Sequence, residues 1–383
     1  MRDNFLVFGA PQISDAEIDE VTATLRSRWL GTGPKVARFE QAFAEYKGIT
    51  PAQTAAVNSC TAALHLSMVA CDLKPGDEVI TTAMTFCATV NAIIHAGATP
   101  VPVDIDPRTR NIDPAAVAAA VTPRTKAILP VHFAGYPCDM DALLEIAVRH
   151  DLRVIEDCAH AIETEYHGRK AGTLGDFGCF SFYVTKNMVT GEGGMVIARD
   201  TDRIARVRRL ALHGLSADAW QRFSDKGYKH YFVEECGFKY NMMDIQAAIG
   251  IHQLARLEEN WQRRQHIWQR YQSAFGDLPL LLPADPAPGL RHAYHLYSVC
   301  LQPAAPISRD EFLQAMNQRK IGTGVHYLAI PEHPFYQQRF GWRTQDFPVA
   351  TAIGRSTVSL PISAALTDDD VSDVIDAVRE LLG

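Results

Sequence analysis

A regular alternation of short apolar runs and helical patterns occupies residues 55–157 and limits the folds open to this chain. The runs predict strands at 55–58, 78–81, 100–105, 126–132 and 152–156, with helices at 61–70, 85–96, 114–120 and 140–150. Strands that alternate with helices are joined by right-handed crossovers, which give a mostly parallel sheet with helices on both faces. Ligands of such sheets bind at the carboxyl ends of the strands. The pattern therefore predicts an α/β fold with a binding site just past the strand ends.

A second, smaller domain is expected after this alternation. A long helical pattern covers about residues 243–275, and the proline-rich segment 276–289 follows it. Beyond that segment the sequence predicts a strand at 294–301, a helix at 309–319 and a final helix for which Thr367 is the N-cap. We expect a large domain of residues 1–250, which includes an N-terminal arm, and a small domain of residues 251–383.

Composition excludes several classes of protein. The chain has 383 residues, of which 47% are hydrophobic, and its net charge of −7 argues against a nucleic-acid partner. Eight cysteines occur without a C-x-x-C pair, and no apolar run is long enough to span a membrane. No signal-peptide pattern opens the sequence, so we expect a reduced cytoplasmic protein. His292 and His295 lack the companion ligands of a metal site, and none is predicted.

Residues 178–194 combine an aromatic run, one lysine and a group of glycines. The run at 179–184 predicts a short buried strand, and the glycines require a tight turn or a close approach of the backbone. Between them lies Lys186. A lysine in this position is either a solvated surface residue, which is the more common case, or a desolvated amine of the kind that forms Schiff bases. Its partners elsewhere in the chain favour the second interpretation.

Pyridoxal phosphate requires a lysine, a carboxylate at its pyridine nitrogen, an anion site and a flat apolar contact. Asp157 closes an apolar strand, where a protonated pyridinium would compensate its buried charge; alternatively it caps the following segment. Phe86 could stack on the ring or belong to the core. His160 could orient the ring or be an ordinary buried histidine.

The phosphate would fit a strand-to-helix junction at residues 58–62. Free backbone N–H groups of Cys60, Thr61 and Ala62 at a helix N-terminus favour an anion, although a simple Ser/Thr cap is the alternative. Ser181, on the strand before Lys186, could also reach the phosphate. Each signal is weak singly, but all of them lie on predicted strands or just past their ends.

Over essentially its whole length the chain resembles the DegT/DnrJ/EryC1/StrS family of sugar aminotransferases, which are fold-type I pyridoxal phosphate enzymes that act on nucleotide-linked keto sugars. The matching motifs lie at residues 29–34 (WLGTGP), 58–63 (NSCTAA), 76–80 (GDEVI), 154–160 (VIEDCAH), 181–186 (SFYVTK), 191–194 (GEGG), 239–244 (KYNMMD), 322–327 (GTGVHY) and 359–361 (SLP). Residues 212–220 and 237–241 are similar to one branch, which makes UDP-4-amino-4-deoxy-L-arabinose from the 4-keto sugar.

The resemblance implies an aspartate aminotransferase-like fold, with a seven-stranded, mostly parallel sheet in the large domain and a smaller α+β domain. It implies glutamate as amino donor and a homodimer with shared sites. It assigns roles to matching residues: Lys186 for the cofactor, Asp157 for the pyridine nitrogen, Phe86 for stacking, Cys60, Thr61, Ala62 and Ser181 for the phosphate, Asn241 for the neighbouring subunit's phosphate, and His326 for the sugar nucleotide.

One residue departs from the family pattern. The motif Ser-Phe-His is usual, but Tyr183 stands at the histidine position, so substrate choice cannot be copied from the branch. A sister group of sugar dehydratases replaces the lysine with histidine, and Lys186 therefore favours transamination. The sequence predicts an aminotransferase of amino-sugar biosynthesis, for lipopolysaccharide, a glycan or an antibiotic. The alternatives are a dehydratase with the same cofactor and a regulatory protein that only binds sugar nucleotides.

Overall fold

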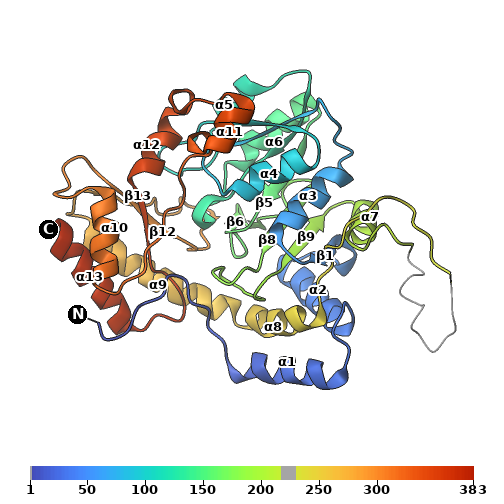
Figure 1. The fold of residues 1–383 in the computed structure, drawn as a ribbon, viewed down its shortest axis with the longest axis horizontal. Helices are drawn as coiled ribbons and strands as arrows, with labels where there is room; N and C mark the ends of the chain where they lie inside the picture. Colours follow the sequence, from blue (N-terminus) through green and yellow to red (C-terminus); the bar gives the residue numbers. More distant parts are fainter. Residues whose placement is uncertain (1, 217–229) are drawn as a thin grey trace.

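The computed structural model describes residues 2–216 and 230–383, and its centre is a seven-stranded sheet (Figure 1). Only β9 runs antiparallel to its neighbours, and the remaining pairs are parallel, so the predicted mostly parallel sheet is confirmed. The strand order is β1 (Thr54–Val57), β9 (Gly194–Ala198), β8 (Phe177–Ser181), β5 (Arg153–Asp157), β4 (Thr125–Leu129), β2 (Glu78–Thr82) and β3 (Thr99–Val103).

Helices cover both faces of this sheet because its strands are apolar on both sides. One face packs against α3 (Cys60–Ala70), α4 (Cys87–His95) and α7 (Thr201–Ala211). The other face packs against α2 (Pro34–Lys47), α5 (Pro114–Ala120), α6 (Met140–His150) and α8 (Asp244–Ala255). Alternation along β5 shows the division, since Ile155 joins the first layer and Val154 the second.

The predicted single helix at 243–275 is wrong, because two helices occupy this range. Arg256, with φ −108° and ψ 13°, separates α8 from α9 (Leu257–Phe275). The helices run one after the other along one side of the molecule (Figure 1). The buried side chains of α8 pack on the large sheet, whereas Ile267, Trp268 and Tyr271 of α9 belong to a second core. A break at Arg256 lets each half face its own core.

The second core surrounds a three-stranded antiparallel sheet, β10 (Leu280–Leu281), β12 (Tyr297–Leu301) and β13 (Thr357–Leu360). Besides α9, it is covered by α10 (Arg309–Gln318) and α13 (Asp368–Leu382), whose N-cap is Thr367 as predicted. The N-terminal arm joins this core, because Leu6 pairs with Ile321. The boundary near residue 250 remains a prediction.

The remaining elements lie around these two cores. A small sheet of β11 (Leu290–Arg291), β6 (Glu165–Tyr166) and β7 (Arg169–Lys170) joins distant parts of the chain. The other helices are α1 (Asp15–Ser27), α11 (Pro334–Phe340) and α12 (Pro348–Ser356). The motif at 212–220 extends into residues 217–229, which lie outside the described residues. Among the helices described, none has the length and apolar character needed to span a bilayer.

Candidate active site

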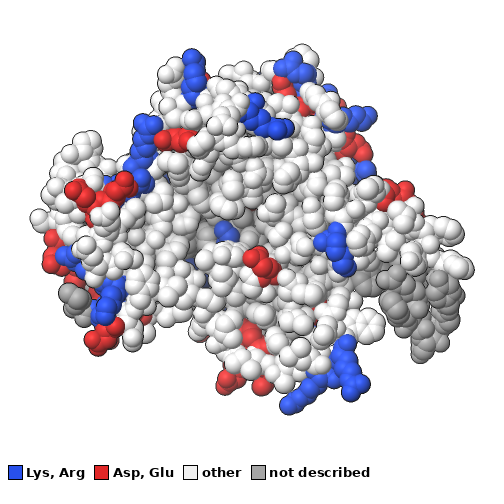
Figure 2. Space-filling model, viewed as in Figure 1, with Lys and Arg blue, Asp and Glu red and all other residues white. Residues whose placement is uncertain are grey.

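A cavity of about 480 Å³ lies past the carboxyl ends of β2, β5 and β8. Figure 2 shows a hollow near the centre of this face, with atoms of a basic side chain at its base. Acidic and basic groups are scattered elsewhere on the same face. Nine residues chosen from the sequence line the cavity: Cys60, Thr61, Phe86, Asp157, His160, Ser181, Tyr183, Lys186 and His326. Ala62 and Asn241 are not among its lining residues.

Lys186 lies in the turn that follows β8. The predicted strand at 179–184 is shorter in the structure and ends at Ser181, because the chain then turns and the Lys186 N–H donates to the Tyr183 carbonyl at 2.9 Å. Burial lowers the pKa of the Lys186 amine to about 8, although the charge of Asp157 favours the protonated form. The amine is therefore partly neutral near physiological pH.

Asp157 is the last residue of β5 and is only 4% exposed. Its Oδ2 accepts a hydrogen bond from the Thr89 hydroxyl at 2.9 Å, and its Oδ1 accepts one from the Ala159 N–H at 3.1 Å. Burial raises the pKa of Asp157, against the effects of these two bonds and of Lys186. The bond to Ala159 is the capping contact considered as an alternative, and Asp157 makes it while also lining the cavity.

The N-terminus of α3 forms the cradle expected for an anion, with one correction. The Ala62 N–H is not free, since it donates to Oγ of Ser59, the N-cap, at 3.1 Å. Within the described chain, the N–H groups of Cys60 and Thr61 make no hydrogen bond. Both residues line the cavity at the positive end of the helix. Ser181 lines it as well.

Aromatic side chains form one wall of the cavity. Phe86 is 57% exposed and is the N-cap of α4 rather than a residue within that helix. Its ring centroid lies 5.9 Å from that of Tyr327, which sequence reasoning had not placed in the site. Ring centroids of Tyr327 and His160 are 6.1 Å apart. The sequence signal for Tyr327 was its place beside His326 in the GTGVHY motif.

His160 and Tyr327 are linked by a directed hydrogen bond. The Ala134 N–H donates to Nδ1 of His160 at 3.3 Å, so the ring proton resides on Nε2. Burial and the charge of Lys186 hold the pKa of His160 well below its usual range, which keeps the ring neutral. Nε2 therefore donates to the Tyr327 hydroxyl, 3.1 Å away. The phenol proton remains available for a ligand in the cavity.

A hydrogen-bond network that the sequence analysis did not predict is centred on Asn187, the residue after Lys186. The Asn187 amide donates to Glu163 and to the Ala293 carbonyl, and its oxygen lies 2.9 Å from Nδ1 of His295. Glu163 in turn forms a buried ion pair with Arg264 of α9. This network joins the lysine turn to the helix of the second core. Its members lie far apart in the sequence, so no motif could have revealed it.

His326, Tyr183 and Asn241 occupy different parts of the site region. His326 Nδ1 lies 2.8 Å from the Ser359 hydroxyl, and its ring stacks on Phe8 of the N-terminal arm at 5.5 Å. Tyr183 is 43% exposed at the cavity. The Asn241 amide donates to Oγ1 of Thr32 at 2.7 Å, outside the cavity of its own chain.

A family model described as the DegT/DnrJ/EryC1/StrS aminotransferase family matches residues 11–379. The chain belongs to this family. It is 49% identical over 383 residues to the spore coat polysaccharide biosynthesis protein SpsC of Bacillus subtilis, covering 100% of this chain and 98% of that protein.

Solved structures agree with this family assignment. The aminotransferase TlmJ from Streptoalloteichus hindustanus superposes with a TM-score of 0.90 at 34% identity, covering 98% of each chain. The pyridoxal phosphate form of the putative sugar aminotransferase Spr1654 from Streptococcus pneumoniae gives 0.91 at 33% identity, covering 99% of this chain and 100% of that chain. The fold is therefore that of the pyridoxal phosphate-dependent sugar aminotransferases.

The cofactor of this DegT/DnrJ/EryC1/StrS aminotransferase is pyridoxal 5′-phosphate, and the cavity residues fit it. A carboxylate with spare acceptor capacity, Asp157, lines the same cavity as the amine of Lys186. Two unbonded N–H groups at a helix N-terminus suit a phosphate, and the exposed face of Phe86 suits an aromatic ring.

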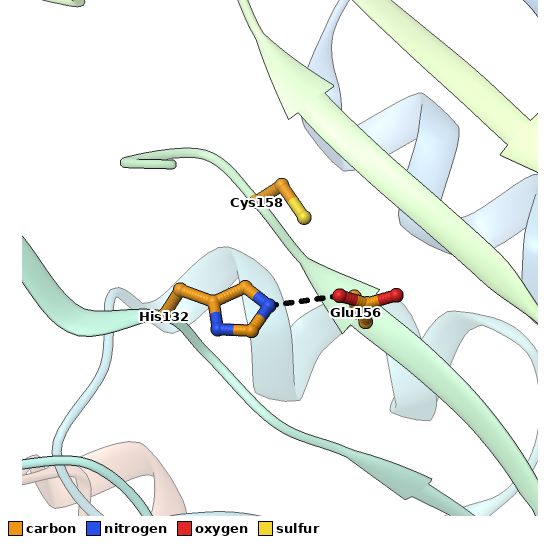
Figure 3. Close-up of side chains that lie close together, drawn as sticks. All are labelled: His132, Glu156 and Cys158. Atoms are coloured by element: carbon orange, nitrogen blue, oxygen red, sulfur yellow. Dashed lines mark hydrogen bonds and ion pairs between the residues drawn. The ribbon is translucent and has the colours of Figure 1, made fainter. Parts of the chain in front are cut away.

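One buried cluster in this aminotransferase has the residue types of a metal site: His132, Glu156 and Cys158 (Figure 3). The Cys138 N–H donates to Nδ1 of His132, so Nε2 carries the proton that it donates to Glu156 at 3.0 Å. Burial keeps the pKa of the Cys158 thiol well above its usual value. Glu156 accepts further hydrogen bonds from the N–H groups of Gly172, Leu174 and Gly175. The cluster is a hydrogen-bonded support for the end of β5.

Proposed function

We propose that this aminotransferase moves an amino group from an amino acid, expected to be L-glutamate, to a nucleotide-linked keto sugar, expected to be a 4-keto sugar. The observation that carries the proposal is the shared cavity of Lys186, Asp157 and the α3 N-terminus. The name of the relative SpsC supports a role in polysaccharide biosynthesis. We expect the reaction to take place in the cytoplasm.

Four residues would bind and orient the cofactor. The Asp157 carboxylate would accept a hydrogen bond from the pyridine nitrogen and keep it protonated. The N–H groups of Cys60 and Thr61 would bind the phosphate, with help from the Ser181 hydroxyl. When bound, the cofactor supplies an electron-accepting ring that stabilises the electron pair left when a neighbouring carbon loses its proton.

Lys186 would serve both as the attachment point and as the acid–base group. With the donor bound, Nζ would accept a proton from the donor α-carbon and would later release that proton, acting first as a base and then as an acid. A pKa of about 8 suits both roles, because the amine gains and loses a proton near physiological pH. Borohydride reduction of the holoenzyme should fix the cofactor on Lys186, and labelling of any other lysine would overturn this assignment.

The experiment that tests the reaction is a panel of nucleotide keto sugars with L-glutamate, analysed by mass spectrometry for an aminated sugar and by assay for 2-oxoglutarate. We expect one or more 4-keto sugars to be aminated. His326 and Tyr183 are proposed to contact the sugar nucleotide, so Tyr183→His should change the preference among panel members. Equal preference in both proteins would remove Tyr183 from the specificity argument.

The same panel separates the alternatives. A dehydratase would release a deoxygenated sugar without consuming glutamate, and a regulatory protein would bind the sugars without turnover. The presence of Lys186 in the cavity favours transamination over both. A colourless protein that stays colourless with added cofactor would contradict every catalytic alternative.

We also propose a homodimer in which Asn241 completes the partner's phosphate site. Asn241 lies outside the cavity of its own chain, as that arrangement requires. Loss of a charge-assisted hydrogen bond of about 1.5–3 kcal/mol would weaken cofactor binding by about 10- to 100-fold. Mixing Lys186→Ala with Asn241→Ala subunits should therefore restore activity, since one site of a mixed dimer is intact. Confirmed subunit exchange without such recovery would contradict the shared site.

A further inference from the structure

Arg110 is a buried arginine that lacks a carboxylate partner among residues 2–216 and 230–383. It lies in the loop between β3 and α5 and is 3% exposed. Its Nη1 donates to the carbonyl of Ser298 in β12 at 2.7 Å, and its buried Nε has no hydrogen-bond partner. The buried Arg264, by contrast, is paired with Glu163.

An unpaired guanidinium in this position is costly. Arginine stays protonated in proteins, so Arg110 cannot relieve its burial by losing a proton. A buried charge without a counter-charge destabilises a fold by several kcal/mol in general. The single carbonyl of Ser298 satisfies one of the five N–H donors of the guanidinium. A negative group beside Arg110 would therefore stabilise its buried charge.

A separate cavity of about 20 Å³ lies beside Arg110. Its walls come from the loop at 108–110, from residues 133–136 and from residues 283–298. None of its lining residues is a carboxylate, and none is shared with the active-site cavity. The carboxylate of Asp106, four residues earlier in the loop, forms no ion pair with Arg110. Its Oδ1 accepts hydrogen bonds from the Arg108 and Thr109 N–H groups and from the Thr109 hydroxyl.

Two neutral donors accompany Arg110 in this cavity. The Tyr294 N–H donates to Nδ1 of His292, so the proton of this ring is on Nε2, and burial lowers the pKa of His292 to about 3. Neither this Nε2 nor the Tyr136 hydroxyl makes a hydrogen bond to a described residue. Both side chains line the cavity. The lining therefore includes two arginines, Arg108 and Arg110, and no acid.

We propose that this cavity binds one small monovalent anion of the size of chloride, held by Arg110 between the β3–α5 loop and β12. The volume sets the size, because a single water-sized sphere needs about 10–15 Å³ and a phosphate ester or sugar nucleotide needs far more. The anion supplies the counter-charge that the protein does not provide. Because its proposed ligands Arg110, Tyr136 and His292 come from three separate segments of the chain, its binding stabilises the packing of these segments.

Bromide, which scatters anomalously, is the direct probe. Crystals of the holoenzyme soaked in sodium bromide should show an anomalous peak within hydrogen-bond distance of Arg110. In solution, replacing gluconate by chloride at constant ionic strength should raise the melting temperature by about 1–3 °C, since ligands of the native state stabilise it.

Arg110→Met should abolish both the bromide peak and the chloride dependence, while Arg169→Met, an exposed arginine outside the cavity, should retain them. No bromide peak at Arg110 in the wild-type crystals would overturn the proposal, and the cavity would then hold water only. A chloride dependence that persists in Arg110→Met would also overturn it, since the ion would then act elsewhere. The bromide peak in the wild-type crystal tests the proposal even if Arg110→Met does not fold.

Discussion

Glu156 and Asp157 are neighbours at the end of β5, yet they face opposite environments. Successive side chains of a strand point to opposite faces. Glu156 accepts four hydrogen bonds, from His132, Gly172, Leu174 and Gly175. Asp157 accepts two and lines the active-site cavity. Both are buried, so the difference between them lies in their partners and not in their depth.

Their pKa values respond accordingly. Burial alone would raise the pKa of Glu156, but the hydrogen bonds from His132 and from the backbone N–H groups of Gly172 and Gly175 outweigh it, and the pKa is lowered. Burial also acts on Asp157, where fewer partners oppose it, and the pKa is raised. A carboxylate accepts about four hydrogen bonds. The protein fills all the hydrogen-bond acceptor positions of Glu156, whereas Asp157 can still accept hydrogen bonds from a ligand. This difference separates a structural acid from a functional one.

The largest effect is expected from Asp157→Asn. Its amide can accept the Ala159 N–H at its oxygen and donate to Thr89, so the fold should remain within about 1 kcal/mol of wild type. The charge at the pyridine nitrogen is lost, and kcat should fall by about 10²–10³-fold. Steady-state kinetics and urea unfolding of the same preparation measure the two quantities. If this variant turns over like the wild type, Asp157 serves only as a cap for the segment that follows β5.

Glu156→Gln should give the opposite result. One end of the amide would place an N–H donor against backbone N–H donors that now meet a carboxylate oxygen, leaving buried groups unsatisfied. We expect a loss of about 2–3 kcal/mol in the free energy of unfolding, with kcat of the folded protein changed little. Because the folded pKa is lowered, the wild-type contribution should persist above the unfolded pKa and disappear as the pH falls through the folded value.

Unfolding at neutral pH provides a check on this variant. If unfolding of Glu156→Gln and of the wild type has the same midpoint at neutral pH, then the four hydrogen bonds do not stabilise the fold as argued. Asp157→Asn serves as the matched control, since it also removes one buried carboxylate from the same strand.

The sequence predicts the strands of the central sheet better than it predicts the roles of the residues at their ends. Alternation identified five of the six strands that share one direction, and motifs identified nine lining residues, because both signals are local. Alternation alone could not say which neighbour in Glu156–Asp157 faces the cavity. The partners of Glu156 lie 16–24 positions away, and the Arg264–Glu163 pair spans 101 positions. Such contacts depend on tertiary packing and leave no periodic pattern.

Other misses have local physical causes. The break at Arg256 occurs within a continuous helical pattern, because two cores compete for the two halves. The Ala62 N–H, expected to be free, donates to Oγ of Ser59, so the Ser/Thr cap considered as the alternative is present. β13 is a buried strand of four residues, too short to show a clear alternation.

A smaller effect should appear in the pH dependence of cofactor attachment. The apoprotein amine of Lys186 reacts when neutral, so the attachment rate should rise about tenfold per pH unit and level off near pH 8. A folded pKa below the unfolded value also means that stability of the apoprotein should rise between about pH 8 and 10.5. Stopped-flow absorbance measures the rate, with Lys186→Ala as the blank.

This profile also distinguishes the two carboxylates. The charge of Asp157 favours the protonated lysine, so Asp157→Asn should move the plateau to lower pH, whereas Glu156→Gln should leave it in place. A rate that continues to rise up to pH 10 in the wild type would show that Lys186 is not desolvated.

The smallest effect is expected from Tyr327→Phe, which tests whether a neighbour of Asp157 in the cavity also binds a ligand. The change removes the hydroxyl that accepts from His160 and directs its own proton into the cavity. One neutral hydrogen bond is worth about 0.5–1.5 kcal/mol, so kcat/KM for the keto sugar should fall by about 2- to 10-fold. Tyr336→Phe is the matched control, because the Tyr336 hydroxyl donates to Asn91 outside the active-site cavity. Equal kcat/KM values for Tyr327→Phe and the control would mean that the phenol proton serves no ligand, and that Asp157 of β5 and Lys186 after β8 act without it.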